Sequence, residues 1–259
     1  MTSAMQEERR RFVVISKNSI CLWKPNGYGP GTWGFQALAQ NCMNILTPFQ
    51  SAFLKAFSQT PLNARFYLTG GTALSAFYLQ HRLSEDLDFF TAEPDAIREV
   101  PETLARLAKI VGYTLQVERS LPAFFDGDLV SSDGTSTKID FAVDSPFRLK
   151  PLVRNGDYGI QIDDALDIYC NKLSALFDRA EAKDFVDVYF ILKERFAWNE
   201  LLENAQKKHV GLEPHLLAKA FLRVQDIKFL PRLVKPLDMK TLQNFFLDLA
   251  RQLMDQLKA

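Results

Sequence analysis

The feature that most limits the possible folds is a glycine pair, Gly70-Gly71, set between two different local patterns. Residues 65–69 before it have the apolar and β-branched composition of a buried strand. Residues 72–80 after it have the apolar spacing of a short helix, and residues 85–90 alternate like a second strand. A strand that turns into a helix at a glycine pair and is followed by another strand predicts a sheet with helices packed on it.

Local patterns predict the other elements in the first part of the chain. Apolar residues recur at helical spacing over residues 46–57, where Thr47-Pro48 supplies a cap and a proline at the first helical position. A second amphipathic helix is expected over residues 95–111. Further strands are expected at residues 113–118 and 137–143, with hairpin turns around Asp126-Gly127-Asp128 and around Ser131-Ser132-Asp133-Gly134.

The pattern changes near Pro146 and Pro151, and every periodic segment after Asp163 is helical. The chain therefore predicts an α+β fold, with a mixed β-sheet core and its helices followed by an all-helical C-terminal part. The expected domains are a poorly ordered extension over residues 1–42, the sheet core over residues 43–150 and the helical domain over residues 151–259.

Composition excludes several classes of protein. The chain has 31 basic and 31 acidic residues, so no overall charge attracts it to nucleic acid, and an RNA partner would need a local basic face. Cys21, Cys42 and Cys170 are odd in number and far apart, which indicates a reduced, cytoplasmic protein without a disulfide framework. The three histidines lack zinc-ligand spacing, and no apolar run approaches the ~20 residues that span a bilayer.

Two acidic residues lie within the strand that follows the glycine pair. Asp86 and Asp88 are two residues apart, so a strand points both carboxylates to one face while Leu87 and Phe89 point into the core. Neighbouring carboxylates repel one another, and their oxygen atoms favour a hard cation such as Mg²⁺ or Mn²⁺. The alternative is that both carboxylates are simply solvated on the outer face of an amphipathic strand.

Other residues extend this candidate metal site. Asp140 would supply a third carboxylate if its strand pairs beside the strand of Asp88, whereas Asp144 is a poorer candidate because Ser145-Pro146 ends that strand. The glycine pair opens a helix, and the free N–H groups at a helix start bind phosphate. Thr72 could add a hydroxyl group to the same phosphate site.

Together these segments resemble a known family. Residues 68–74 and 81–90 resemble the first motif of the DNA polymerase β-like nucleotidyltransferases, and more closely that of the AbiEii/AbiGii toxin family, with a spacer at the long end of the superfamily range. Residues 138–141 resemble the second motif, residues 167–173 the third and residues 179–189 the fourth. The resemblance extends from about Met43 to Leu192.

The resemblance implies roles for individual side chains. Lys172 would contact the nucleotide phosphates, and its alternative is a surface lysine with its stem on the core. Asp184 and Asp187 would polarise an acceptor hydroxyl or hold Lys172, or else form a helix ladder with Arg179 and Lys183. The implied set comprises metal ligands Asp86, Asp88 and Asp140, catalytic residues Lys172, Asp184 and Asp187, and nucleotide-binding residues Gly70, Gly71, Thr72, Arg82, Ser84 and Lys172, with a loop-structural role equally open for Arg82 and Ser84.

The resemblance also implies a function. Such a protein is the toxin of a type IV toxin–antitoxin or abortive-infection pair, transfers a nucleoside monophosphate from an NTP in the presence of Mg²⁺ or Mn²⁺, and has a separate antitoxin as partner. In some members the acceptor is the 3′ end of tRNA. The alternatives are an enzyme that modifies a small molecule or a protein, and a nucleotide-binding module without turnover. Candidates for an RNA-binding surface are Arg148, Lys150, Arg154, Lys228, Arg232 and Lys235.

Overall fold

The computed structural model describes residues 13–16, 19–22 and 45–256. The chain forms two compact units, Met1–Asn44 and Ile45–Ala259. In the first unit, strands β1 (Val13–Ser16) and β2 (Ser19–Leu22) pair in antiparallel fashion. The other residues of the extension expected over residues 1–42 lie outside the described part of the chain.

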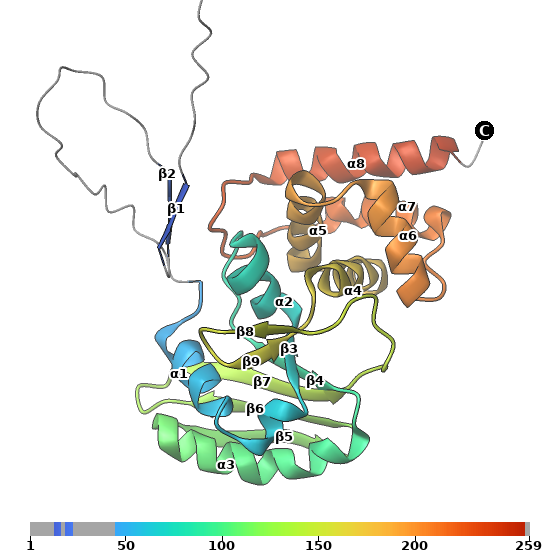
Figure 1. Ribbon diagram of the computed structural model, residues 1–259. Helices are drawn as coiled ribbons and strands as arrows, with labels where there is room; N and C mark the ends of the chain where they lie inside the picture. Colours follow the sequence, from blue (N-terminus) through green and yellow to red (C-terminus); the bar gives the residue numbers. More distant parts are fainter. Residues whose placement is uncertain (1–12, 17–18, 23–44, 257–259) are drawn as a thin grey trace, which may run out of the picture. The chain divides into compact units, whose positions relative to one another are not determined.

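A seven-stranded mixed sheet forms the centre of the second unit, in the order β5-β6-β7-β4-β3-β9-β8 (Figure 1). The β4–β7 and β3–β9 pairs are parallel and the other pairs are antiparallel. The α+β prediction is confirmed. The strands are β3 (Tyr67–Thr69), β4 (Leu87–Thr91), β5 (Thr114–Leu121), β6 (Phe124–Val130), β7 (Ser136–Val143), β8 (Val153–Asn155) and β9 (Ile160–Ile162).

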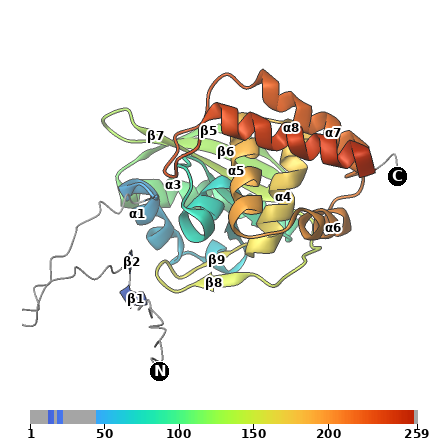
Figure 2. The same cartoon turned by 90° about the horizontal axis from the view of Figure 1, so that it is seen from above.

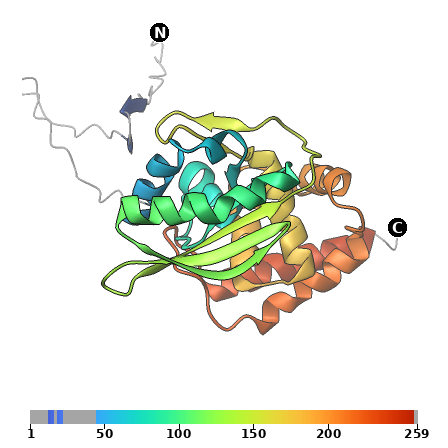
Figure 3. The same cartoon turned by 90° about the horizontal axis from the view of Figure 1, so that it is seen from below.

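One face of the sheet is apolar and is covered by helices α1 (Pro48–Phe57) and α3 (Val100–Val111). Phe57 packs on Phe89 of β4 with ring centroids 4.5 Å apart, and Phe89 stacks on Phe141 of β7 at 4.8 Å. Figure 3 shows α3 lying across this face of the sheet. Burial of these large aromatic rings is the main force that holds the helices to the sheet.

The opposite face of the sheet is polar, and the C-terminal helices lie on that side (Figure 2). Phe185 of α5 packs edge-on against Phe246 of α8, which joins these helices through their own apolar core. The remaining helices are η1 (Pro61–Ala64), α2 (Gly70–Ala73), the π-helix η2 (Leu74–Leu79), η3 (Pro94–Glu99), α4 (Ala165–Asp178), α5 (Ala182–Glu194), α6 (Trp198–Lys208), α7 (Pro214–Leu222), η4 (Arg223–Asp226) and α8 (Met239–Gln256).

Thr47 starts helix α1 as the sequence predicts. Its hydroxyl accepts the backbone N–H of Gln50, and the Gln50 side chain accepts the N–H of Thr47, which completes a capping box. The amide nitrogen of Gln50 also donates to the carbonyl oxygens of Ser84 and Glu85, at 3.0 and 3.2 Å. The start of α1 therefore holds the loop that leads into β4.

The structure corrects three boundaries. The turn expected around Asp126-Gly127-Asp128 is wrong, because these residues lie inside β6, where a Cβ on Gly127 would be only 2.5 Å from the Gln116 carbonyl oxygen. The helix expected from Asp95 begins as the 3₁₀ helix η3, and α3 starts at Val100. The sheet also continues past residue 150, since β8 and β9 join it beside β3, so the helical part begins at α4.

Candidate active site

A row of polar residues crosses four neighbouring strands on the polar face of the sheet. Asp88 of β4 lies opposite Thr69 of β3 on one side and opposite Asp140 of β7 on the other. Asp140 in turn lies opposite Asp126 of β6. Residues paired in register point to the same face, so Asp140 lies beside Asp88, as the sequence predicts.

Asp86 lies just before β4, in a loop held from two sides. The buried hydroxyl of Thr72 donates a hydrogen bond to the backbone carbonyl oxygen of Asp86. Gln50 holds the two preceding carbonyl oxygens, those of Ser84 and Glu85. The hydroxyl hydrogen of Thr72, expected at a phosphate, is therefore already used to fix the position of Asp86.

The glycine pair fits between two groups of side chains. Gly70 has a positive φ of 70°, and a Cβ on it would lie 2.0 Å from Oδ2 of Asp88. A Cβ on Gly71 would lie 2.8 Å from Nη2 of Arg82 and 2.9 Å from Oγ of Ser84. Only glycine leaves room here. The pair thus has the Asp88 carboxylate on one side and the Arg82 and Ser84 side chains on the other.

Asp187 of α5 gathers the cationic side chains of the site. Its Oδ1 accepts from Nε of Arg82 and from Nε2 of His81, each at 2.7 Å. Its Oδ2 accepts from Nη2 of Arg82 at 2.9 Å and lies 2.8 Å from Nζ of Lys172. Burial alone would raise the pKa of Asp187, but the charges of Lys172 and Arg82 outweigh burial and hold the pKa well below its usual value.

Asp184 has a separate partner. Its two carboxylate oxygens accept from Nε and Nη2 of Arg179, both at 2.8 Å, in a bidentate pair. Lys183 lies 3.3 Å from Glu181 instead. The pair with Arg179 is therefore present only for Asp184, but Arg179 lies at the end of α4 and not on α5, so the pair is not a ladder within one helix. Asp187 binds cations from other elements.

The carboxylate row also changes the protonation of Asp88. Burial is the main cause that raises the pKa of Asp88 to about 6; the charges of Asp140 and Asp86 act in the same direction, and the charge of Lys172 lowers the pKa. A carboxylate in this environment binds a proton or a cation more readily than an exposed one does.

The family model of the nucleotidyl transferase AbiEii toxin of type IV toxin–antitoxin systems matches residues 52–257. The chain belongs to this AbiEii family. It is thus a nucleotidyltransferase, and the predicted family resemblance is confirmed. The glycine pair, the carboxylates and Lys172 all lie within the matched residues.

Other proteins of known sequence or structure are similar to this chain. The uncharacterized protein aq_aa25 of Aquifex aeolicus (strain VF5) is 30% identical over 167 residues, which cover 63% of this chain and 75% of that protein. JHP933 from Helicobacter pylori has a similar fold, with a TM-score of 0.51, 21% identity, and coverage of 81% of this chain and 90% of that one. MenT4, a nucleotidyltransferase toxin from Mycobacterium tuberculosis H37Rv, has a TM-score of 0.51, 19% identity, and coverage of 80% and 82%.

The donor set of this AbiEii protein suits a hard cation. Oδ1 of Asp140 is buried without a hydrogen-bond partner, and its Oδ2 lies 2.8 Å from Nζ of Lys138. Among residues 45–256, no three acidic, histidine or cysteine side chains are already gathered at coordinating distance. Mg²⁺ is commonly held by one or two carboxylates together with waters and substrate phosphates, so a complete protein cage is not required.

Sequence reasoning missed two buried residues of the AbiEii site. Asp126 was assigned to a turn, although the alternation of Phe125, Gly127 and Leu129 around it is a strand signal. Its carboxylate is held by Arg119, with Nη2 to Oδ2 at 2.7 Å. For His81, the sequence shows no zinc-ligand spacing and places the residue in the segment that resembles the first motif, without a role of its own. It is fully buried against Asp187, burial lowers its pKa, and its Nδ1 has no partner.

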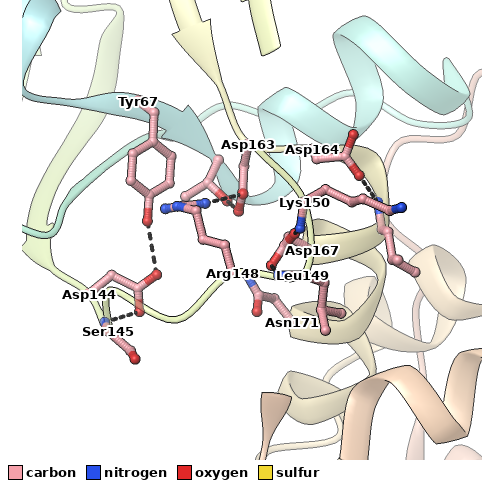
Figure 4. Close-up of polar contacts among 12 residues, drawn as sticks. Tyr67, Asp144, Ser145, Arg148, Leu149, Lys150, Asp163, Asp164, Asp167 and Asn171 are labelled. Carbon is pink, nitrogen blue, oxygen red and sulfur yellow. Dashed lines mark hydrogen bonds and ion pairs between the residues drawn. The ribbon is translucent and has the colours of Figure 1, made fainter. Parts of the chain in front are cut away.

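A second ionic cluster lies at the end of β7 (Figure 4). Arg148 binds the buried Asp163 at 2.6 Å, and Thr69 donates to the other oxygen of Asp163. The guanidinium of Arg148 lies 3.9 Å from the ring centroid of Tyr67, whose hydroxyl donates to Asp144. Thr69 thus links this cluster directly to the carboxylate row.

Half of the six basic residues proposed for an RNA-binding surface are paired with acids. Arg148 binds Asp163, Arg232 binds Glu85 and Lys235 binds Glu194. Their charges are therefore partly neutralised within the protein. Within the described part of the chain, no helix is long and apolar enough to cross a membrane.

Proposed function

We propose that this AbiEii nucleotidyltransferase is metal-dependent and transfers a nucleoside monophosphate from an NTP to the 3′-terminal hydroxyl of tRNA. The observation that carries the proposal is the pairing of Asp88 with Asp140 in register directly beside Gly70. Two carboxylates, one of which has an oxygen without a hydrogen-bond partner, lie together beside a backbone that carries no side chain. That combination suits a phosphate held together with a divalent cation.

Arg82, Lys172 and Ser84 would bind the outer phosphates of the NTP. Arg82 and Lys172 are positioned by one buried carboxylate, Asp187, so they meet the phosphates without reorganising. One carboxylate between two cations leaves a net charge of about +1, since the low pKa of buried His81 keeps it neutral. Pyrophosphate would leave on this side when the acceptor hydroxyl attacks the α-phosphorus in line.

Asp86, Asp88 and Asp140 would hold Mg²⁺ or Mn²⁺. Such a cation, when bound, supplies neutralisation of the negative charge that grows on the α-phosphate during transfer. Thr72 and Gln50 keep the loop of Asp86 in place, and Gly70 lets Asp88 come close to the backbone. Most of the rate would come from this positioning and charge neutralisation.

The family supports the partner and the nucleotide substrate, and the tRNA acceptor is part of the proposal. Family membership supports a separate antitoxin protein as partner and an NTP as substrate, and we place the reaction in the cytoplasm, where both substrates are found. A small-molecule or protein acceptor is the second candidate, because Arg148, Arg232 and Lys235 already have acidic partners.

The test is to incubate the purified protein with total tRNA, Mg²⁺ and each α-labelled NTP in turn. Asp86→Asn and Asp88→Asn together should abolish the label on tRNA, whereas the exposed control Asp157→Asn should not. Pyrophosphate release without label on tRNA would indicate that the acceptor is a protein or a small molecule. Equal labelling by the wild type and the double variant would contradict the assigned site.

A further inference from the structure

A second row of side chains lies next to the carboxylate row on the polar face of the sheet. Tyr67 lies opposite Phe90, Phe90 lies opposite Ala142 and Ala142 lies opposite Phe124. Each is two residues along its strand from the carboxylate row, a separation of about 7 Å. The aromatic row, Tyr67-Phe90-Ala142-Phe124, thus runs parallel to Thr69-Asp88-Asp140-Asp126.

Ala142 makes a gap in this aromatic row. Phe90, Ala142 and Phe124 are all partly exposed, unlike the buried rings of Phe89 and Phe141 on the other face. Phe90 and Phe124 belong to strands on either side of β7, so their backbones are about 10 Å apart. That spacing leaves room above Ala142 for the flat ring of a ligand, between the side chains of Phe90 and Phe124.

Both ends of the aromatic row are closed by arginine. Arg148 lies over the ring of Tyr67 at 3.9 Å, and Tyr67 is almost fully buried. Arg119 lies over the ring of Phe124 at 4.9 Å. The part of the row left open to a ligand is therefore the centre, at Phe90 and Ala142.

The order of groups along the face gives the direction of the substrate. Arg82 and Ser84 contact the space beside Gly71, and Asp88 contacts the space beside Gly70. In the proposed function, the cations attract the outer phosphates at one end and the carboxylates take the α-phosphate at the other. The rest of the nucleotide must extend away from Arg82, along β4 from Asp88 toward Phe90, and a ribose spans the distance between the two rows.

We propose that the base of the NTP stacks on Phe90 at the centre of the aromatic row, with Ala142 providing the room. The inference rests on the proposed function, because it uses the direction of the triphosphate. Stacking on aromatic side chains tolerates every base, since each base has a π-face. The row therefore selects a nucleoside over a bare polyphosphate.

The test compares Mg²⁺-dependent binding of an NTP and of inorganic tripolyphosphate by calorimetry. Ala142→Leu fills the gap and Phe90→Ala removes one stacking partner, while Ala105→Leu, at an exposed position of α3, is the control. We expect both variants to weaken NTP binding at least about tenfold, with tripolyphosphate binding and the control unchanged. Because tripolyphosphate binds at the cations, its retained affinity also reports that the variants are folded.

Unchanged NTP affinity in Ala142→Leu would overturn the assignment of the base. A parallel loss of NTP and tripolyphosphate affinity would overturn it as well, because the row would then act on the phosphate site. If the variants raised only the KM of the acceptor in the labelling assay, the aromatic row would bind the acceptor and not the base of the NTP. Failure of the proposed function is separate, since it would appear as wild-type protein that binds NTP but labels no acceptor.

Discussion

Nζ of Lys172 lies 2.8 Å from Oδ2 of Asp187, and the two side chains are only 8% and 0% exposed. A lysine that followed the surface alternative would keep its ammonium group in water. Here the ammonium group is fixed by a carboxylate that also binds Arg82. The position of both cations, which we propose to bind phosphate, therefore depends on one residue of α5 that need not touch the substrate.

Asp187→Asn should destabilise the protein by about 3–5 kcal/mol, because it leaves two buried cations without their counter-ion. Unfolding in urea measures this loss. Glu102→Gln removes one partner of the exposed pair with Arg106 and should cost less than about 1 kcal/mol. Similar small losses in both variants would show that Asp187 does not hold the cations as described.

Gly70→Ala should abolish nucleotidyl transfer, because the new Cβ would lie 2.0 Å from Oδ2 of Asp88. Gly112→Ala is the matched control. Gly112 has a φ of 78° and nothing within 4 Å of its would-be Cβ, so this variant meets only the backbone cost, about 1 kcal/mol. We expect steady-state kinetics to show normal turnover for Gly112→Ala. Normal turnover in Gly70→Ala would contradict the close contact.

Asp88→Asn should stabilise the metal-free protein at pH 8. The folded-state pKa of Asp88, about 6, is above its ordinary value of 3.8, so the folded state binds this proton more tightly than the unfolded state does. The contribution of Asp88 to stability therefore falls as the pH rises from about 4 to 6 and stays low above. At pH 8 the gain should be up to about 3 kcal/mol, since each pKa unit corresponds to about 1.4 kcal/mol.

Urea unfolding in EDTA at pH 8 and pH 4 checks this prediction. The difference between Asp88→Asn and the wild type should be clear at pH 8 and nearly absent at pH 4. Added Mg²⁺ should stabilise the wild type at pH 8 but not the variant. A variant that is less stable at pH 8 without metal would show that Asp88 is not held under electrostatic strain.

Gln50→Leu should lower kcat, because it releases the carbonyl oxygens of Ser84 and Glu85 beside Asp86. Thr47→Val is the comparison, since it removes the hydroxyl that caps α1 and leaves those two contacts intact. Each variant should lose about 1 kcal/mol of stability. Only Gln50→Leu should slow the reaction, and equal kcat values would assign Gln50 to the helix cap alone.

Short-range patterns were enough to predict part of the site. The alternation around Asp88 and Asp140 fixes which face each carboxylate occupies, and their pairing follows once the two strands are neighbours. Asp126 was missed because Asp-Gly is a strong turn signal, whereas here Gly127 is needed for the close approach of β5. Local signals cannot distinguish these two uses of a glycine.

The cationic part of the site depends on long-range contacts. Asp184 and Asp187 are one helical turn apart, and nothing in the local sequence separates a bond to Arg179 from a bond to Lys172 and Arg82. The burial of His81 likewise follows from the packing of α5 and from the segment before α8, whose backbone N–H groups at Val234 and Lys235 donate to the His81 carbonyl oxygen. Such contacts become visible only in the fold.

The measurement that tests the central claim most directly is an electron paramagnetic resonance titration of Mn²⁺ in the presence of a non-hydrolysable NTP. The account predicts that the wild-type protein binds Mn²⁺ with the nucleotide, that Asp88→Asn and Asp140→Asn each lose this binding, and that Asp157→Asn keeps it. Wild-type Mn²⁺ binding in both Asp88→Asn and Asp140→Asn would contradict the assignment of the paired carboxylates as the metal site.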